Sequence, residues 1–232
     1  MYSRTAHVTV NGQNLSSAIS LLAPGCEAIT QVAGATATQV AFTCKPVVSG
    51  PIPISAQFSG ATLATINSVV PEPRVTMQTT LGQIVLELNP KKAPITVANF
   101  MQYVASGFYN GLIFHRVVPR FVIQGGGFNS ALQQAATLAP IALEVPNGLS
   151  NIRGSVAMAR TATLNSATSQ FFINSVDNLS LDTTGGGYAV FGSVVVGLNV
   201  ADAIAAVPTQ TTGGFSDVPV TPIVITSAAQ TQ

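Results

Sequence analysis

Residues 113–128 read IFHRVVPRFVIQGGGF, and this stretch decides the fold. One apolar run carries His115 and Arg116 side by side, and a second run ends in a glutamine and three glycines. Successive side chains of a β-strand point to opposite faces. If Arg116 faces a cleft, His115 therefore faces the interior, and the sequence predicts a core histidine beside an exposed arginine.

Two familiar kinds of active site do not fit this stretch. A Ser-His-Asp hydrolase needs a histidine oriented by a carboxylate near a nucleophile, but His115 is flanked by Phe114 and Val117 and no GxSxG elbow is present. A phosphate-binding loop needs Gly-Lys-Ser/Thr after its glycines, and here Phe128 follows. The glycine run predicts close backbone packing after a strand.

Composition sets wider bounds on the 232-residue chain. The apolar fraction is 47% and the charged fraction 7%, with a net charge of +1. The chain therefore has material for a sizeable core but no basic stripe to bind nucleic acid. No apolar run is long enough to span a bilayer, and no signal peptide is visible before the first strand-like run. We expect that a signal was removed from this sequence.

The two cysteines, Cys26 and Cys44, lie in the first quarter of the chain, without a histidine at metal-ligand spacing. A disulfide between them is expected, which indicates an oxidising compartment and a periplasmic or secreted protein. Two buried free thiols in a cytosolic protein are the alternative. No metal and no cofactor are expected.

The chain divides by pattern near the PEP at residues 71–73. Residues 1–73 show short alternating runs separated by turns, which predicts a small all-β domain. The segment VTVNGQNL with the later GC and FTC resembles small immunoglobulin-like modules of secreted bacterial proteins. Residues 74–232 predict many short strands with two helices, at about 94–106 and 199–206, and a last strand in PIVITSA. This pattern favours a closed β-barrel capped by helices.

The candidate site that remains consists of Arg116, Phe121 and Gln124, without a nucleophile, a base or a metal. Rotation about an X-Pro bond needs no such group. Its barrier of about 18–20 kcal/mol comes from amide resonance. An enzyme lowers it by holding the proline ring and binding the twisted amide better than the planar one. A guanidinium suits this task because it donates to the freed lone pair and keeps its charge.

Three blocks of the sequence are informative together: the opening stretch FHRVVPRFVIQGGGF, then GSVAMARTATLNSATSQFFIN, and then LD with GYAVFGSVVVGLNVADAI. In this order they resemble the signature blocks of the cyclophilins, closest to the periplasmic bacterial branch, from about Arg74 to residue 228. The resemblance implies a mainly β fold, an eight-stranded antiparallel barrel capped by two helices, and peptidyl-prolyl cis–trans isomerase activity. With the first segment, the fold class is this barrel preceded by a small β-sandwich.

The resemblance also implies site residues. Arg116 is the implied catalytic guanidinium, and Gln124 the implied anchor of the substrate backbone. The implied substrate-binding residues are Phe121, Val122, Ala159, Arg160, Gln170, Phe172, Leu181 and Tyr188. Arg160 is implied to act through its backbone.

Simpler readings remain open for several of these residues. Phe121, Phe172 and Leu181 also fit the role of barrel core residues, and Phe171 fits that role best. Arg160 also fits an ordinary surface charge. Ser180 stands where the family carries an aromatic residue that helps to bind cyclosporin, so weak cyclosporin binding is expected. Arg120 replaces a glycine common in the family.

The expected partners are proline-containing unfolded or extended polypeptides, with folding of secreted proteins as the role. A binding or chaperone module without catalysis is the alternative, because Ser180 removes an apolar wall. The partner of residues 1–73 is not indicated by the sequence.

Overall fold

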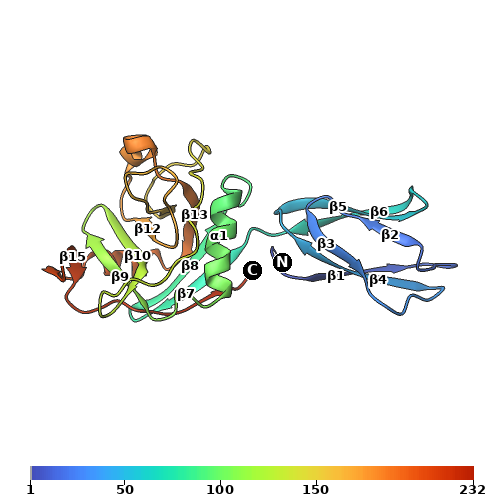
Figure 1. Ribbon diagram of the computed structural model, residues 1–232, viewed down its shortest axis with the longest axis horizontal. Helices are drawn as coiled ribbons and strands as arrows, with labels where there is room; N and C mark the ends of the chain where they lie inside the picture. The colour runs from blue at the N-terminus through green and yellow to red at the C-terminus, as the bar shows by residue number, and fades with distance from the viewer. Residues whose placement is uncertain (1) are drawn as a thin grey trace. The chain divides into compact units, whose positions relative to one another are not determined.

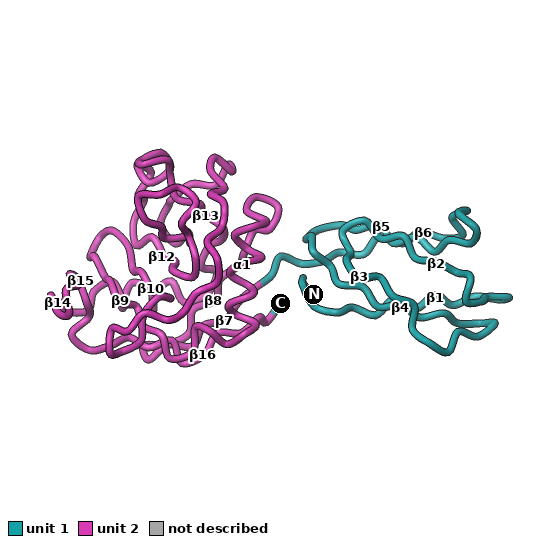
Figure 2. Tube along the Cα trace, in the orientation of Figure 1, with its two compact units in different colours: residues 1–73, 232 teal, residues 74–231 magenta. Residues whose placement is uncertain are grey.

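The computed structural model describes residues 2–232 and divides them into two compact units (Figure 2). The first unit ends at Pro73, and the second comprises Arg74–Thr231. Both are built mainly from strands, as Figure 1 shows. None of the helices among residues 2–232 is long and apolar enough to cross a bilayer.

The first unit is a small sandwich of two three-stranded sheets. One sheet has the order β1 (Ala6–Asn11), β4 (Gln39–Pro46), β3 (Cys26–Gln31), and the other the order β2 (Ile19–Leu22), β5 (Gly50–Phe58), β6 (Ala61–Val70). Both sheets contribute to one core, formed by Ile19, Val40, Phe42 and Ala56. The expected disulfide is present and joins Cys26 of β3 to Cys44 of β4, with their Cα atoms 5.6 Å apart.

The middle strand β5 contains Pro51 and Pro53, although proline cannot donate to a ladder. Its neighbour β2 pairs only with residues Ser55–Phe58, so the half of β5 with the prolines has β6 as its one partner. At the prolines, the side of β5 that faces away from β6 has no neighbouring strand, so the prolines interrupt no hydrogen-bond ladder on that side.

The second unit is an eight-stranded antiparallel barrel, as expected. Its strand order is β16 (Ile225–Gln230), β7 (Arg74–Thr79), β8 (Gly82–Leu88), β13 (Val190–Val196), β11 (Ser155–Met158), β12 (Phe171–Asn174), β10 (Val122–Asn129), β9 (Leu112–Val118). The barrel closes just before β16, where Ile113 forms a bridge with Val224 and the amide of Phe114 donates to Ile223 O. The last strand thus begins later than PIVITSA predicts, because its first residues close the barrel instead.

Two α-helices accompany the barrel, α1 (Pro94–Ala105) and α2 (Leu198–Ala205), close to the predicted ranges. Pro94 occupies the first turn of α1, where its missing N–H costs nothing, and Gly107 follows its end with a φ of +70°. No neighbouring side chain caps the start of α1. The carboxylate of Glu144 does so from a distant segment, accepting from the amides of Ile95 and Thr96 at 3.0 and 2.7 Å.

A hairpin of β14 (Thr209–Thr212) and β15 (Phe215–Pro219) was not foreseen in the sequence. Its Phe215 ring packs on Phe128 at 4.9 Å, and Phe128 packs on His115 at 4.7 Å. The hairpin is thereby attached to the barrel beside β9.

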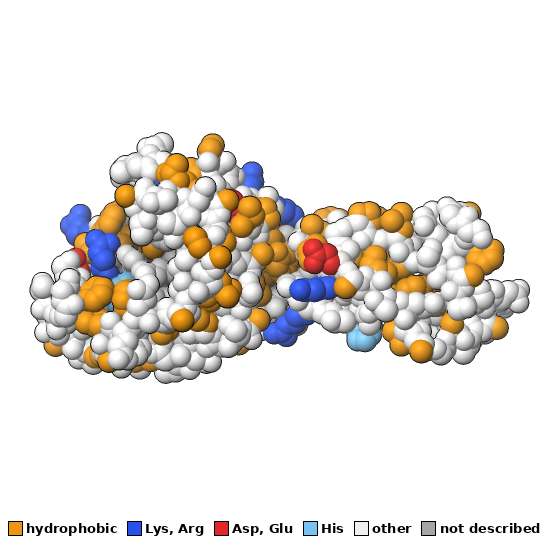
Figure 3. Space-filling view, viewed as in Figure 1, with side chains coloured by type: hydrophobic (Ala, Val, Ile, Leu, Met, Phe, Trp, Pro, Cys, Tyr) orange, Lys and Arg blue, Asp and Glu red, His pale blue; other side chains and the backbone are white. Residues whose placement is uncertain are grey.

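Buried aromatic rings fill the barrel around Phe100. Tyr109, Phe171 and Phe191 lie with their centroids 5.1–5.6 Å from it. Phe171 is completely buried, so the core reading of this residue is correct. The surface, by contrast, carries few charges, and Figure 3 shows a face that is mostly uncharged polar and apolar.

Candidate active site

One cavity on the barrel unit gathers most of the residues that the resemblance implies. It measures about 180 Å³ and is lined by Arg116, Phe121, Val122, Gln124, Ala159, Arg160, Phe172, Leu181 and Tyr188. The tenth residue, Gln170, lies beside it and accepts a hydrogen bond of 2.9 Å from Gln124 Nε2. The cavity is smaller than the roughly 300–1,000 Å³ of sites for drug-sized ligands, so it suits a single small ring.

The floor of this cavity is apolar. Val122, Ala157, Phe172 and Val190 form one buried cluster from four neighbouring strands. Phe121, Ala159, Leu181 and Tyr188 pack against the cluster and remain partly exposed. Phe172 and Tyr188 meet edge to face at 5.7 Å. An apolar ring placed here would contact this cluster and the side chains packed against it.

A polar chain runs along one edge of the cavity. Arg116 and Gln124 are cross-strand neighbours on β9 and β10, and Arg116 Nη1 donates to Gln124 Oε1 at 3.5 Å. Gln124 in turn donates to Gln170. On the other side, Arg116 Nε lies 3.9 Å from a carboxylate oxygen of Asp217. The guanidinium therefore lines the cavity with a polar neighbour on two sides, the amide of Gln124 and the carboxylate of Asp217.

Sequence reasoning missed Asp217, and no local pattern could have identified it. The residue lies in the β14–β15 hairpin, about 100 positions after Arg116. It adopts a φ of +59°, a left-handed conformation that Asp tolerates better than most residues. Only the packing of the hairpin beside β9 brings this carboxylate to the arginine.

His115 faces the interior, as the alternation of the strand predicts, and its exposed fraction is 4%. Burial, followed by the neighbouring charge of Arg116, lowers its pKa to about 4. Hydrogen bonding with the Ile113 backbone and the Gln170 side chain partly opposes this shift. The imidazole is therefore neutral at physiological pH, and His115 is a core residue rather than a base facing the cavity.

The glycine run has a packing role next to the polar chain. A Cβ on Gly126, whose φ is +82°, would lie 2.9 Å from the Tyr109 ring and 3.0 Å from Ser169 O. A Cβ on Gly127 would lie 2.6 Å from Gln170 Cγ. Gly127 thus leaves the space that the Gln170 side chain occupies.

Arg120 lies in the turn between β9 and β10 with a φ of +57°. Glycine adopts this conformation without steric cost, whereas other residues do so at about 1–2 kcal/mol. This explains why a glycine suits the position. The Arg120 side chain is exposed and forms no ion pair or hydrogen bond with the residues that the structure describes.

A segment rich in glycine forms one wall of the cavity. It consists of two short 3₁₀ turns, η1 (Leu179–Asp182) and η2 (Thr184–Gly186), followed by Gly187 and Tyr188. The Arg160 guanidinium lies 4.6 Å above the Tyr188 ring and donates to the carbonyls of Gly185 and Gly187. Arg160 is thus not an ordinary surface charge.

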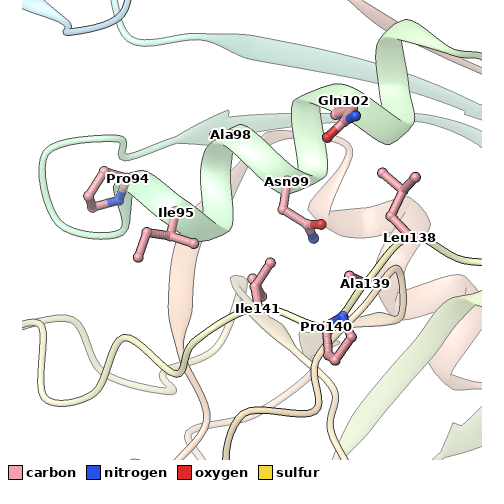
Figure 4. A pocket seen from close by; sticks show the side chains of 9 residues that line it. All are labelled: Pro94, Ile95, Ala98, Asn99, Gln102, Leu138, Ala139, Pro140 and Ile141. Carbon is pink, nitrogen blue, oxygen red and sulfur yellow. The ribbon is translucent and has the colours of Figure 1, made fainter.

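A larger hollow of about 770 Å³ lies between α1 and residues 138–141 (Figure 4). Apolar side chains dominate its lining, including Ile95, Leu138 and Ile141, with Asn99 and Gln102 as polar members. It contains no ionisable side chain. The smaller cavity is therefore the better candidate for chemistry, despite its size.

Comparison with known proteins agrees with this geometry. The family model for cyclophilin type peptidyl-prolyl cis-trans isomerase/CLD matches residues 74–230. Peptidyl-prolyl cis-trans isomerase A of Dickeya dadantii is 52% identical over 173 residues, covering 74% of this chain and 88% of that protein. Peptidyl-prolyl cis-trans isomerase cyp18 of Streptomyces antibioticus is 55% identical over 159 residues, covering 66% and 96%.

Solved structures give a similar result. A cyclophilin type peptidyl-prolyl cis-trans isomerase from Cryptosporidium parvum matches with a TM-score of 0.59 and 26% identity, covering 69% of this chain and 98% of that chain. A second crystal structure of that protein, obtained in the presence of the dipeptide Ala-Pro, matches with a TM-score of 0.58.

Proposed function

The chain belongs to the cyclophilin-type peptidyl-prolyl cis–trans isomerase family and is such an isomerase, and from this premise we propose how its own residues act. Arg116 stabilises the twisted X-Pro amide, and Gln124 anchors the substrate backbone beside it. The proline ring occupies the cavity over Phe172, with Phe121, Val122, Leu181 and Tyr188 as its walls. Ala159, Gln170 and the Arg160 backbone contact the residues before the proline.

The mechanism follows from what rotation does to the amide. In the planar state the prolyl nitrogen shares its lone pair with the carbonyl, and this resonance creates the barrier. In the twisted state the lone pair returns to the nitrogen, which becomes a hydrogen-bond acceptor. A donor that binds this nitrogen only in the twisted state lowers the barrier without tightening ground-state binding. No bond is broken, and no proton has to be transferred.

A single observation carries this proposal: a guanidinium lines a small cavity with an apolar floor, 3.5 Å from the side chain of Gln124 on one side and 3.9 Å from the carboxylate of Asp217 on the other. A donor fixed before the reaction does not have to reorient as the charge shifts. The neutral, buried His115 supplies no competing acid or base.

We also propose that the substrates are extended, proline-containing chains in an oxidising compartment such as a bacterial periplasm, where the enzyme assists the folding of secreted proteins. The Cys26–Cys44 disulfide and the bacterial relatives support this location. The Ala-Pro dipeptide used with the Cryptosporidium parvum protein supports the substrate class.

The test of the site is a proline isomerisation assay on a short Ala-Pro peptide. Replacing Arg116 by Ala is expected to lower kcat about 100-fold, the usual scale for losing one preorganised donor. Arg116→Lys keeps the charge but loses the planar fork, so it should remain well below the wild type. Arg153→Ala is the matched control, because Arg153 forms an exposed ion pair with Asp202 away from the cavity. An Arg116→Ala variant with wild-type kcat contradicts the assignment.

A further inference from the structure

The wall of the cavity formed by residues 179–188, here called the glycine loop, has apolar contacts with the buried cluster only through Leu181 and Tyr188. None of the residues in its two 3₁₀ turns is buried. Leu179 is 58% exposed, and Ser180 is exposed as well. Three consecutive glycines, Gly185 to Gly187, all have positive φ values. Because glycine loses more conformational freedom on ordering than other residues, this loop needs other contacts to keep one shape.

Polar contacts fix the first half of the glycine loop. The Asp182 carboxylate accepts hydrogen bonds from the backbone amide and side-chain amide of Asn151, at 2.7 and 2.8 Å. These bonds hold the pKa of Asp182 below its usual value, although desolvation opposes them. Asn151 is fully buried and accepts a further bond from Asn174. The loop is therefore tied to the barrel at Asp182.

The second half receives a hydrogen bond of 3.3 Å from Asn151 Nδ2 at Tyr188 O, and its other side-chain hydrogen bonds come from Arg160. Arg160 Nε and Nη2 donate to Gly187 O at 3.0 and 2.8 Å, and Nη2 also donates to Gly185 O at 2.6 Å. Nη1 donates to Thr161 O at 2.9 Å, close to Arg160 itself. The guanidinium carbon Cζ lies over the Tyr188 ring, 4.6 Å from its centroid, at a distance typical of a cation–π contact. One planar group thus binds the loop carbonyls and stacks on a cavity wall.

We propose that Arg160 is a positioning residue that holds the glycine loop in the shape that the proline cavity requires. The proposal rests on the function assigned to this cavity above. Arg160 acts through Tyr188 directly and through Leu181 indirectly, because Tyr188 N donates to Leu181 O at 2.9 Å. The polar attachment replaces the apolar anchoring that the exposed Ser180 does not provide.

This role has a kinetic signature that differs from that of Arg116. A loosened loop must be ordered again whenever substrate binds, and the cost falls equally on the ground state and the transition state. Such a loss raises KM and leaves kcat unchanged, whereas loss of a transition-state contact lowers kcat. Arg160 and Arg116 variants should therefore separate on these two quantities.

The experiment compares Arg160→Ala, Arg160→Lys, Arg116→Ala and Arg153→Ala in the full chain. Binding and exchange of an Ala-Pro peptide are measured by NMR, and amide hydrogen exchange is followed in the glycine loop and in β9 and β10. Arg160→Ala is expected to raise KM about tenfold with kcat within about twofold of the wild type. The amides of Thr183, Gly186, Gly187 and Tyr188 should exchange faster, with β9 and β10 unchanged. Arg160→Lys should resemble Arg160→Ala, since one ammonium cannot bridge these carbonyls and stack on a ring.

Two results overturn the proposal: an unchanged KM in Arg160→Ala, whether or not kcat falls, or full recovery of KM in Arg160→Lys. Each must be seen while Arg116→Ala still lowers kcat, which shows that the cavity is the active site. If Arg116→Ala has no effect, the site assignment fails first and for a separate reason. Should Arg160→Ala not fold, Arg160→Lys carries the same comparison of KM, kcat and loop exchange.

Discussion

Burial of His115 makes the stability of the barrel depend on pH in a defined window. The pKa of this imidazole falls from 6.5 to about 4, chiefly through desolvation. The unfolded chain therefore binds a proton at a higher pH than the folded chain does. The contribution of the neutral imidazole is fully present above pH 6.5 and is lost as the pH falls toward 4.

The expected size follows from the two pKa values. The fall of the pKa from 6.5 to about 4 corresponds to about 3 kcal/mol of unfolding free energy at the low-pH limit. At pH 4.5 the loss relative to pH 7.5 is about 2.5 kcal/mol. His115→Gln removes the titration while keeping a polar side chain at the same place.

Urea unfolding at pH 7.5 and 4.5 measures this loss for both proteins. Tyrosine fluorescence is a suitable signal, since the chain has no tryptophan and three of its four tyrosines lie between residues 74 and 231. The wild type should lose about 2.5 kcal/mol more than His115→Gln over this interval. Equal losses in the two proteins refute the reasoning, as does an NMR titration of His115 with a midpoint near 6.5. Isomerase kcat should stay flat between pH 5.5 and 8, because Arg116 keeps its charge.

Four further changes have distinct expected outcomes. Replacing both Cys26 and Cys44 by Ser should destabilise the first unit by about 3 kcal/mol, seen in urea unfolding, with kcat/KM unchanged. Gly127→Ala should displace Gln170 and lower kcat/KM about tenfold or more, with little change in melting temperature. Ser180→Trp should tighten cyclosporin binding about tenfold by restoring an apolar wall, measured by calorimetric titration against a weakly binding wild type. Arg120→Gly should relieve the left-handed backbone and stabilise the barrel by about 0.5–1 kcal/mol, and a destabilised variant would contradict the strain.

Features set by short stretches of chain were predictable from the sequence. The alternation of β9 placed His115 inside and Arg116 outside, and Pro94 with Gly107 marked the ends of α1. The glycine run was correctly assigned to packing, since the three residues lie against Tyr109, Phe114 and Gln170. These features follow from the two-residue period of a strand, from the residues that favour helix ends, and from the absence of a Cβ in glycine.

Contacts between distant segments were not predictable in this way. Glu144 caps α1 from about 50 residues away, Asp217 reaches Arg116 from about 100 residues away, and the Arg160 side chain binds a loop about 25 residues later. Each is set by how the strands cross the barrel, and a single acidic or basic residue in a loop gives no local signal of its partner. The family resemblance implies a role for the backbone of Arg160 and none for its side chain.

The order of the strands also has a consequence during protein synthesis. The first strand of the barrel, β7, pairs with β16, so the partner of Arg74–Thr79 is made only when Ile225–Gln230 emerges. At about 5–20 residues per second, the chain between them takes roughly 7–30 s to appear. All six strands of the first unit precede this interval and can pair before it begins. During the wait, β7 offers an unpaired edge of the kind that promotes aggregation. In this strand the partly exposed Arg74 and Thr76 and the exposed Gln78 alternate with buried neighbours, which gives the unpaired strand one polar face and helps it to remain in solution.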